Sequence, residues 1–218
     1  MENIIIVEHA TKKFKDATVL KDVNISFEKG KIHGIIGRNG SGKTVLFKSI
    51  CGFMPLTEGS ITVAGKVIGK DVEVPKNVGA IIEAPGFLPN YSGFKNLKLL
   101  AIIQKKISDD DIRQTMQRVG LDAKSRKWVG KYSLGMRQRL GLAQAIMENP
   151  DILILDEPMN GLDNRGVEDM RKLLLGLKEE GKTILLASHS SEDIDVLCDT
   201  VHEMDAGVLS TVYPKDSE

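Results

Sequence analysis

Short apolar runs separated by glycine-rich turns predict β-strands in the first third of the chain. These runs carry β-branched residues and span residues 4–8, 23–27, 31–36 and 60–63. The segment 64–66, which follows the last run, is typical of a hairpin turn. After the third run, a glycine-rich segment leads into a predicted helix that begins at 42 or 43 and ends near 51.

Helical spacing replaces this pattern between about residues 90 and 140. Apolar positions there recur every three or four residues, as they do on one face of a helix. Ser108 is followed by Asp109, Asp110 and Asp111, and it predicts a helix start because the hydroxyl and the acids complement a helix N-terminus. Gly120 predicts the end of that helix.

Helices and strands alternate in the last third of the chain. The predicted order is helix 136–147, strand 152–156, helix 165–180, strand 183–188, helix 192–198 and a hairpin around 205–207. Such alternation predicts an α/β fold with a mostly parallel sheet that is covered on both faces. The apolar stripe of helix 165–180 is expected to pack against this core.

Composition and charge exclude several classes of protein. The chain has 218 residues, and 30 Lys and Arg balance 30 Asp and Glu, so it lacks the basic excess of a protein that coats nucleic acid. No uncharged apolar run approaches the roughly 20 residues that span a bilayer. The first residues do not resemble a secretory signal, and two cysteines make no disulfide framework. A cytoplasmic protein is expected.

A phosphate-binding loop is predicted between strand 31–36 and the helix that follows it. The segment fits the pattern G-x-x-x-x-G-K-[ST] in its required strand–turn–helix context, which argues against a glycine-rich turn with an incidental Lys-Thr pair. Glycines let backbone N–H groups surround phosphate oxygens, the lysine reaches the β- and γ-phosphates, and the threonine hydroxyl is suited to Mg²⁺. The predicted ATP-binding residues are Gly37, Arg38, Asn39, Gly40, Ser41, Gly42, Lys43 and Thr44.

Two acids, Asp156 and Glu157, follow the four apolar residues 152–155 at the end of strand 152–156. The strand would deliver Asp156 to the carboxyl edge of the sheet, where the phosphate loop also opens. An aspartate at this position is suited to hold Mg²⁺, and Glu157 is suited to accept a proton from the water that attacks the γ-phosphate. Alone, the pair is equally typical of a strand that ends in solvated acids; together with the phosphate loop it favours a nucleotide hydrolase.

Four further segments narrow this class. Residues 132–139 (YSLGMRQR) are similar to the signature motif of ABC transporters, 160–163 (NGLD) to their D-loop, and 188–189 (SH) to the segment with their switch histidine. Phe14 precedes Gly37 by 23 residues, where that family places an aromatic residue under the adenine. In order and spacing, residues 3 to 212 resemble the ATP-binding subunit of an ABC transporter.

This resemblance implies a P-loop NTPase fold with an antiparallel β subdomain and a helical insert: residues 1–89 for the β subdomain and phosphate loop, about 90–140 for the insert, and 141–218 for the rest of the core. It implies that two copies, or this chain and a similar subunit, form a pair that sandwiches ATP and Mg²⁺. The pair would lie on the inner face of the cell membrane and act with membrane permease subunits. The implied residues are Lys43, Glu157 and His189 for catalysis, Phe14 for adenine, Ser133 and Gly135 for the partner's γ-phosphate, and Thr44, Asp156 and Glu83 for Mg²⁺.

The sequence departs from the family pattern at a few positions. Glu83 stands where the family has a glutamine, and Leu134 and Met136 stand where the signature has glycine and glutamine. Segments 82–87 and 132–136 resemble the bacitracin-resistance and lantibiotic-immunity branch, which implies export of a peptide antibiotic. The alternative for Glu83 is a tolerated surface exchange. A glutamate there should bind a metal more strongly but repel the γ-phosphate.

Two other functions remain open from the sequence. A non-transport ABC ATPase that acts on DNA or ribosomes usually has coiled coils or two cassettes, and neither pattern is found in these 218 residues. A metabolite kinase would explain the phosphate loop but not 132–139, 160–163 or 188–189.

Overall fold

A six-stranded sheet forms the centre of the structure, a computed structural model that describes residues 2–15, 17–83 and 86–214. The strand order is β10-β9-β3-β8-β7-β6, and all neighbours run parallel except the β9–β10 hairpin. The strands are β3 (Ile32–Ile36), β6 (Val78–Ile81), β7 (Ile152–Asp156), β8 (Thr183–Ala187), β9 (Thr200–Asp205) and β10 (Val208–Pro214). The predicted α/β class is confirmed.

A second sheet has four antiparallel strands in the order β2-β1-β4-β5. These strands are β1 (Asn3–Phe14), β2 (Ala17–Glu28), β4 (Glu58–Val63) and β5 (Lys66–Val67). The turn between β4 and β5 has positive φ angles at Ala64 and Gly65, as a tight hairpin requires. β1 and β2 are much longer than the sequence pattern predicts.

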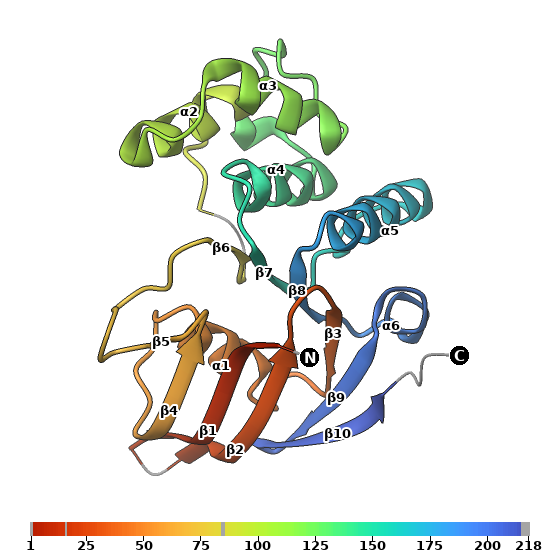
Figure 1. The fold of residues 1–218 in the computed structure, drawn as a ribbon. Helices are drawn as coiled ribbons and strands as arrows, with labels where there is room; N and C mark the ends of the chain where they lie inside the picture. Colours follow the sequence, from red (N-terminus) through yellow and green to blue (C-terminus); the bar gives the residue numbers. More distant parts are fainter. Residues whose placement is uncertain (1, 16, 84–85, 215–218) are drawn as a thin grey trace.

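Helix α1 (Lys43–Ile50) lies between the two sheets and packs against both (Figure 1). Its buried apolar side chains are Leu46, Phe47 and Ile50. Alternate residues of each central strand face this core or the one behind it: Ile152 and Ile154 lie in the core with α1, and Leu153 and Leu155 lie in the other. Helices α5 (Asn164–Glu179) and α6 (Ser191–Leu197) cover that second face.

The helical insert stands above the sheets in Figure 1. It contains α2 (Gly93–Gln104), α3 (Asp109–Arg118), the 3₁₀ helix η1 (Val129–Lys131) and α4 (Leu134–Ile146). Ser108 caps α3 in a reciprocal capping box with Asp111, and Gly120 ends the helix with a φ of 76°. α4 begins two residues before the predicted start, because the Ser133 hydroxyl accepts from the Met136 N–H. The proposed boundary near residue 140 would lie inside α4.

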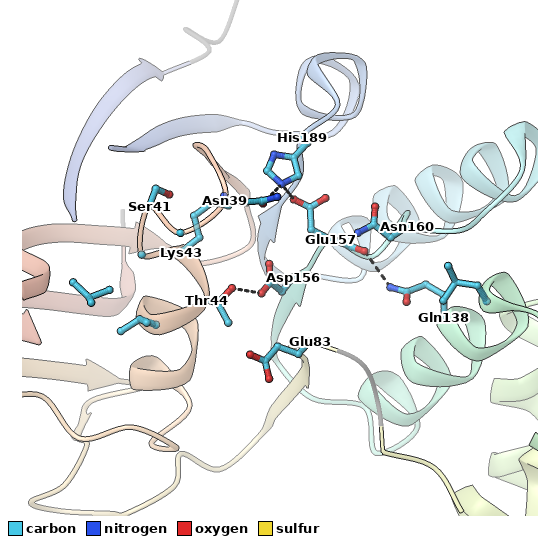
Figure 2. A pocket seen from close by; sticks show the side chains of 15 residues that line it. Asn39, Ser41, Lys43, Thr44, Glu83, Gln138, Asp156, Glu157, Asn160 and His189 are labelled. Carbon is cyan, nitrogen blue, oxygen red and sulfur yellow. Dashed lines mark hydrogen bonds and ion pairs between the residues drawn. The ribbon is translucent and has the colours of Figure 1, made fainter. Parts of the chain in front are cut away.

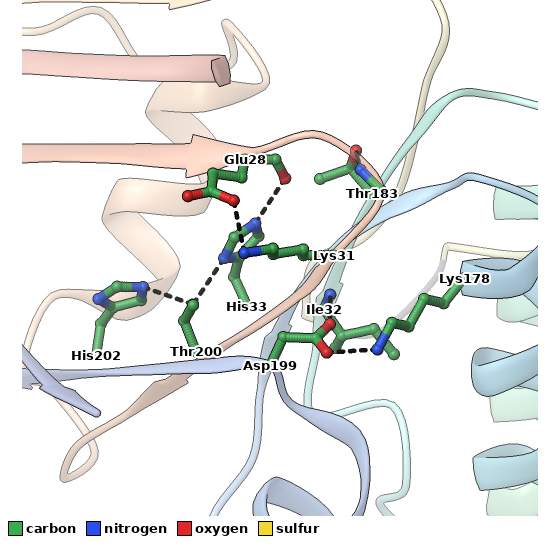
Figure 3. A network of polar contacts seen from close by, with 10 residues as sticks. Glu28, Lys31, Ile32, His33, Lys178, Thr183, Asp199, Thr200 and His202 are labelled. Atoms are coloured by element: carbon green, nitrogen blue, oxygen red, sulfur yellow. Dashed lines mark hydrogen bonds and ion pairs between the residues drawn. The ribbon is translucent and has the colours of Figure 1, made fainter. Parts of the chain in front are cut away.

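Two buried histidines join the sheets through a chain of hydrogen bonds, part of which Figure 3 shows. His33 Nε2 faces the Glu28 carbonyl oxygen at 2.8 Å, so this nitrogen carries the proton, and Nδ1 accepts from the Thr200 hydroxyl at 2.7 Å. His202 Nε2 then donates to Thr200 Oγ1 at 3.0 Å, and its Nδ1 accepts from the Thr211 hydroxyl at 3.2 Å. Both imidazoles are satisfied while neutral, as expected for histidines with a structural role.

No helix within the described ranges combines the length and the apolar character that a membrane crossing requires.

Candidate nucleotide-binding site

The loop between β3 and α1 curves around one side of a pocket with a volume of about 480 Å³. Its glycines Gly37, Gly40 and Gly42 have φ angles of 143°, 78° and 118°, which side chains with a Cβ rarely adopt. At Gly42 a Cβ would lie 2.9 Å from the Val19 carbonyl oxygen, whereas at Gly40 it would meet nothing within 4 Å. The sequence prediction of a glycine-dependent loop therefore matches the backbone.

The N-terminus of α1 differs from that of the other α-helices in the described part of the chain. Side chains cap α2 to α6, and the capping residues are Ser92, Ser108, Ser133, Asp163 and Ser190. The α1 N-cap is Gly42, which provides no side-chain acceptor. Its first-turn N–H groups and the positive end of the helix dipole are therefore available to an anion, and a phosphate fits this position.

Two polar side chains in the loop also suit a phosphate. The Lys43 ammonium donates to the carbonyl oxygens of Gly37 at 2.6 Å and Arg38 at 3.2 Å, and it lines the pocket. The Ser41 hydroxyl is buried and has no hydrogen-bond partner among the described residues. A triphosphate would supply the acceptor that this hydroxyl lacks.

Oxygen ligands of the kind that Mg²⁺ prefers lie at the adjoining strand ends (Figure 2). The Thr44 hydroxyl donates to Asp156 at 2.7 Å, and Glu83, two residues after β6, lines the same pocket. Within the described ranges no group of three or more His, Cys, Asp or Glu residues could hold a metal alone. The hydroxyl of Thr44 and the carboxylates of Asp156 and Glu83 are oxygen donors of the type that fits Mg²⁺ beside phosphates. Ala84 and Pro85, in the same predicted segment, lie outside the described residues.

Glu157 and His189 meet in the same pocket, next to Asn39 of the phosphate loop. His189 Nε2 lies 3.0 Å from Glu157 Oε1 and 2.9 Å from Asn39 Oδ1 (Figure 2). Burial raises the pKa of Glu157 above its usual range, although His189 opposes this shift. A carboxylate with a raised pKa, next to the phosphate cradle, is suited to accept a proton from water.

The pocket includes residues that the sequence pattern did not single out. Val19 of β2 and Asn160 line it, and so does Gln138 of α4, whose amide donates to the Glu157 carbonyl oxygen at 3.2 Å. Gln138 and Asn160 belong to the two motifs at 132–139 and 160–163, which was the available signal. Nothing in the sequence marked Val19.

Three predicted nucleotide-binding residues lie apart from this pocket. Phe14, at the end of β1, is 42% exposed with the Lys12 ammonium 5.0 Å from its ring centroid. Ser133 and Gly135 line a different hollow, which they share with residues near Asp163. Their roles therefore stay predictions that need a nucleotide or a second copy to be tested.

The sequence matches the family model of the ABC transporter over residues 20–160. The chain belongs to the ABC transporter family. This ABC cassette is 49% identical to the uncharacterized ABC transporter ATP-binding protein YybJ of Bacillus subtilis, over 98% of this chain and 100% of that protein. It is 40% identical to the bacitracin transport ATP-binding protein BcrA of Enterococcus faecalis, over 96% of this chain and 68% of that protein.

Two further similarities concern another transport protein and the fold. The ABC cassette is 35% identical to the lantibiotic transport ATP-binding protein SrtF of Streptococcus pyogenes, over 89% of this chain and 84% of that protein. Its fold matches the dimeric structure of the cassette MJ0796 with a TM-score of 0.86 and 21% identity, over 96% of this chain and 99% of the other. The chain is thus an ABC ATPase and the ATP-binding subunit of an ABC transporter, and the metabolite-kinase alternative is wrong.

Proposed function

We propose that this ATPase lies at the inner face of the cell membrane and powers the export of a peptide antibiotic of the bacitracin or lantibiotic class. Separate membrane permease subunits would provide the path for the peptide. The observation that carries the proposal is the identity of 35–40% to the ATP-binding proteins named for bacitracin and lantibiotic transport. Segments 82–87 and 132–136 of the sequence support the same branch.

The chemistry in this proposal is assigned to named side chains. The loop 37–44 binds the phosphates, and Thr44, Asp156 and Glu83 hold Mg²⁺, which would offset the phosphate charge. Glu157 accepts the proton of the attacking water, and His189 contacts the γ-phosphate. The distances within this group support the assignment, since Thr44 contacts Asp156 at 2.7 Å and His189 contacts Glu157 at 3.0 Å.

The site is proposed to be completed by a second copy, or by a similar subunit. Ser133 and Gly135 lie at the N-terminus of α4. The Ser133 hydroxyl caps the Met136 N–H there, and its own proton, the other N–H groups of the first turn and the helix dipole favour an anion. Because Ser133 and Gly135 line a different hollow from Lys43, one chain does not bring both sets to one nucleotide. Phe14 is proposed to stack on the adenine of the ATP bound to its own loop.

A mixing experiment tests the shared site. Lys43→Ala removes the phosphate contact and Ser133→Ala removes the contribution to the partner, so each variant alone should hydrolyse ATP poorly. Mixed pairs contain one intact composite site and should recover turnover, measured as phosphate release. A matched control is Ser108→Ala, which removes another helix cap in the insert and should hydrolyse ATP at the normal rate. Mixed pairs that stay inactive contradict the shared site.

The substrate is tested in the native host. Deletion of the gene should lower the concentrations of bacitracin or of a lantibiotic that inhibit growth, and the intact gene should restore them. The Glu157→Gln variant should fail to restore them although it binds ATP. Equal inhibitory concentrations for both peptide classes, with and without the gene, would rule out the proposed substrate.

A further inference from the structure

Glu83 adds a negative charge to a pocket that is already acidic. The charged side chains that line the pocket, apart from His189, are Glu83, Asp156, Glu157 and Lys43, so carboxylates outnumber the ammonium group. A triphosphate brings more negative charge, and like charges repel each other. Without a bound metal ion, the extra carboxylate is therefore unfavourable for nucleotide binding unless a nearby side-chain cation offsets it.

Lys48 provides this cation. Its ammonium lies 2.7 Å from Glu83 Oε1, and its side chain is only 26% exposed, against 63% for Glu83. Lys48 does not line the nucleotide pocket. It lines a second groove, which is also lined by residues of β6 and α4. The Lys48 ammonium therefore approaches Glu83 from the side of α1 and leaves the phosphate position open.

The arrangement follows from the spacing along one helix. Thr44 and Lys48 are four residues apart on α1 and so lie on the same face of it. β6 and β7 are parallel neighbours, so Glu83 and Asp156 emerge at the same edge of the sheet. Thr44 holds Asp156 and Lys48 holds Glu83, each at 2.7 Å. One face of α1 thus contacts the acids that follow two adjacent strands.

The backbone at Glu83 is also unusual. Its φ is 61°, a left-handed conformation that is uncommon for residues other than glycine. Figure 2 draws the carboxylate below Asp156 and Thr44, and all three residues line the same pocket. Because Glu83 lines the pocket together with Thr44 and Asp156, a metal held by these residues could replace Lys48 as the partner of the Glu83 carboxylate.

We propose that Lys48 is a positioning residue for the nucleotide site. Its ammonium offsets the charge of Glu83 and holds this carboxylate beside α1 until a metal ion takes the place of the ammonium as the partner of Glu83. The inference deepens the proposed function and rests on it. Without the Lys48 charge, Glu83 repels the phosphates of a metal-free nucleotide. The Glu83 carboxylate also binds Mg²⁺ more readily, because the Lys48 ammonium no longer competes for it. Metal-free ATP binding therefore weakens, whereas the Mg²⁺ concentration needed for half-maximal binding falls.

The test is a double-mutant cycle that reads binding and not turnover. Lys48→Met keeps the aliphatic stem and removes the charge. Calorimetry in EDTA should show metal-free ATP bound about two- to five-fold more weakly, the range of an exposed ion pair. A Mg²⁺ titration with a fluorescent ATP analogue should show half-maximal binding at a lower Mg²⁺ concentration. In the Glu83→Gln background, Lys48→Met should change neither value.

Two controls separate charge from structure. Lys48→Arg keeps the positive charge and should restore both wild-type values. Lys98→Gln breaks a comparable pair in the insert, where Lys98 lies 2.6 Å from Asp109, and should change neither value. If Lys48→Met lowers the unfolding temperature, Lys48→Gln repeats the cycle.

The inference is overturned if Lys48→Met changes the ATP affinity and the Mg²⁺ concentration for half-maximal binding equally in the wild-type and the Glu83→Gln backgrounds. A wild type that binds no ATP under either condition overturns the proposed function as well, so the two failures are distinguishable.

Discussion

Glu157 is held in place through its backbone as well as its carboxylate. Its φ is 53°, its N–H donates to the Ala187 carbonyl oxygen at 3.0 Å, and its own carbonyl oxygen accepts from Gln138. These bonds tie the residue to β8 on one side and to the insert on the other. At the scale of the residue, the proposed base is thus positioned by contacts that do not involve its own side chain.

Replacement of Glu157 should separate binding from hydrolysis. Glu157→Gln keeps the size of the side chain and these backbone bonds but removes the proton acceptor. We expect phosphate release to fall by about 10²–10⁴-fold while ATP binding is retained. Glu179→Gln, on the exposed end of α5, serves as the control and should have wild-type activity. Unchanged turnover in Glu157→Gln would remove this residue from the proposed mechanism.

At the scale of the element, β6 and α4 pack at very close range. A Cβ at Gly79 would lie 1.9 Å from the Ala145 carbonyl oxygen of α4, which cannot move without displacement of the helix. Glycine at this position therefore allows α4, which carries the signature residues, to lie directly on the edge strand of the central sheet.

A single methyl group should disturb this packing. Gly79→Ala is expected to lower the free energy of unfolding by about 1–3 kcal/mol, the usual effect of overpacking, as measured by urea denaturation. Gly176→Ala in α5 is the matched control, because a Cβ there meets nothing within 4 Å. Since alanine is the better helix former, this control should gain up to ~1 kcal/mol. A neutral Gly79→Ala would mean that α4 can shift away from β6 at little cost.

The elements that the sequence predicted well are those with a clear period. Strands β7 and β8 consist almost entirely of apolar residues, and α1, α3 and α5 begin and end close to the expected residues. β1 and β2 were underestimated because register shifts interrupt their pairing, with positive φ at His9 and Asp22. Such bulges break the alternation of apolar and polar residues on which strand prediction depends.

Local sequence patterns predicted the residues of the site but not the contacts between residues that are far apart in the sequence. Lys43, Thr44, Asp156, Glu157 and His189 were predicted from local motifs, and the structure brings them to one pocket. The partner of Glu83 was not predicted, because Lys48 is separated from it by 35 residues and neither belongs to a shared motif. The positions of Phe14, Ser133 and Gly135 relative to a nucleotide depend on a ligand or a second copy.

At the scale of the whole molecule, the buried histidines connect β2 of the small sheet with β3, β9 and β10 of the large one. Burial lowers the pKa of His202 to about 4, and burial likewise lowers the pKa of His33. In the unfolded chain both would titrate near pH 6.5. Between these values the unfolded chain binds more protons than the folded chain, so the folded state loses stability as the pH falls.

Stability should therefore decrease from about pH 6.5 towards pH 4, by roughly 3 kcal/mol for His202 alone. Above pH 6.5 this contribution is fully present. Urea denaturation at several pH values measures the slope, and His202→Gln, which cannot titrate, should have a smaller slope in this range. An equal slope in both proteins would show that His202 does not contribute to the loss.

The bonds from the Lys43 ammonium to the carbonyl oxygens of Gly37 and Arg38 have a consequence for the way a ligand is captured. An incoming phosphate does not meet a waiting cation; it has to compete with the protein's own backbone for it. Arrival of the ligand is thus an exchange of partners, with little net change in the number of hydrogen bonds that the lysine makes. Such an exchange makes the release of these two carbonyl groups part of every binding event in which the ammonium turns to a phosphate.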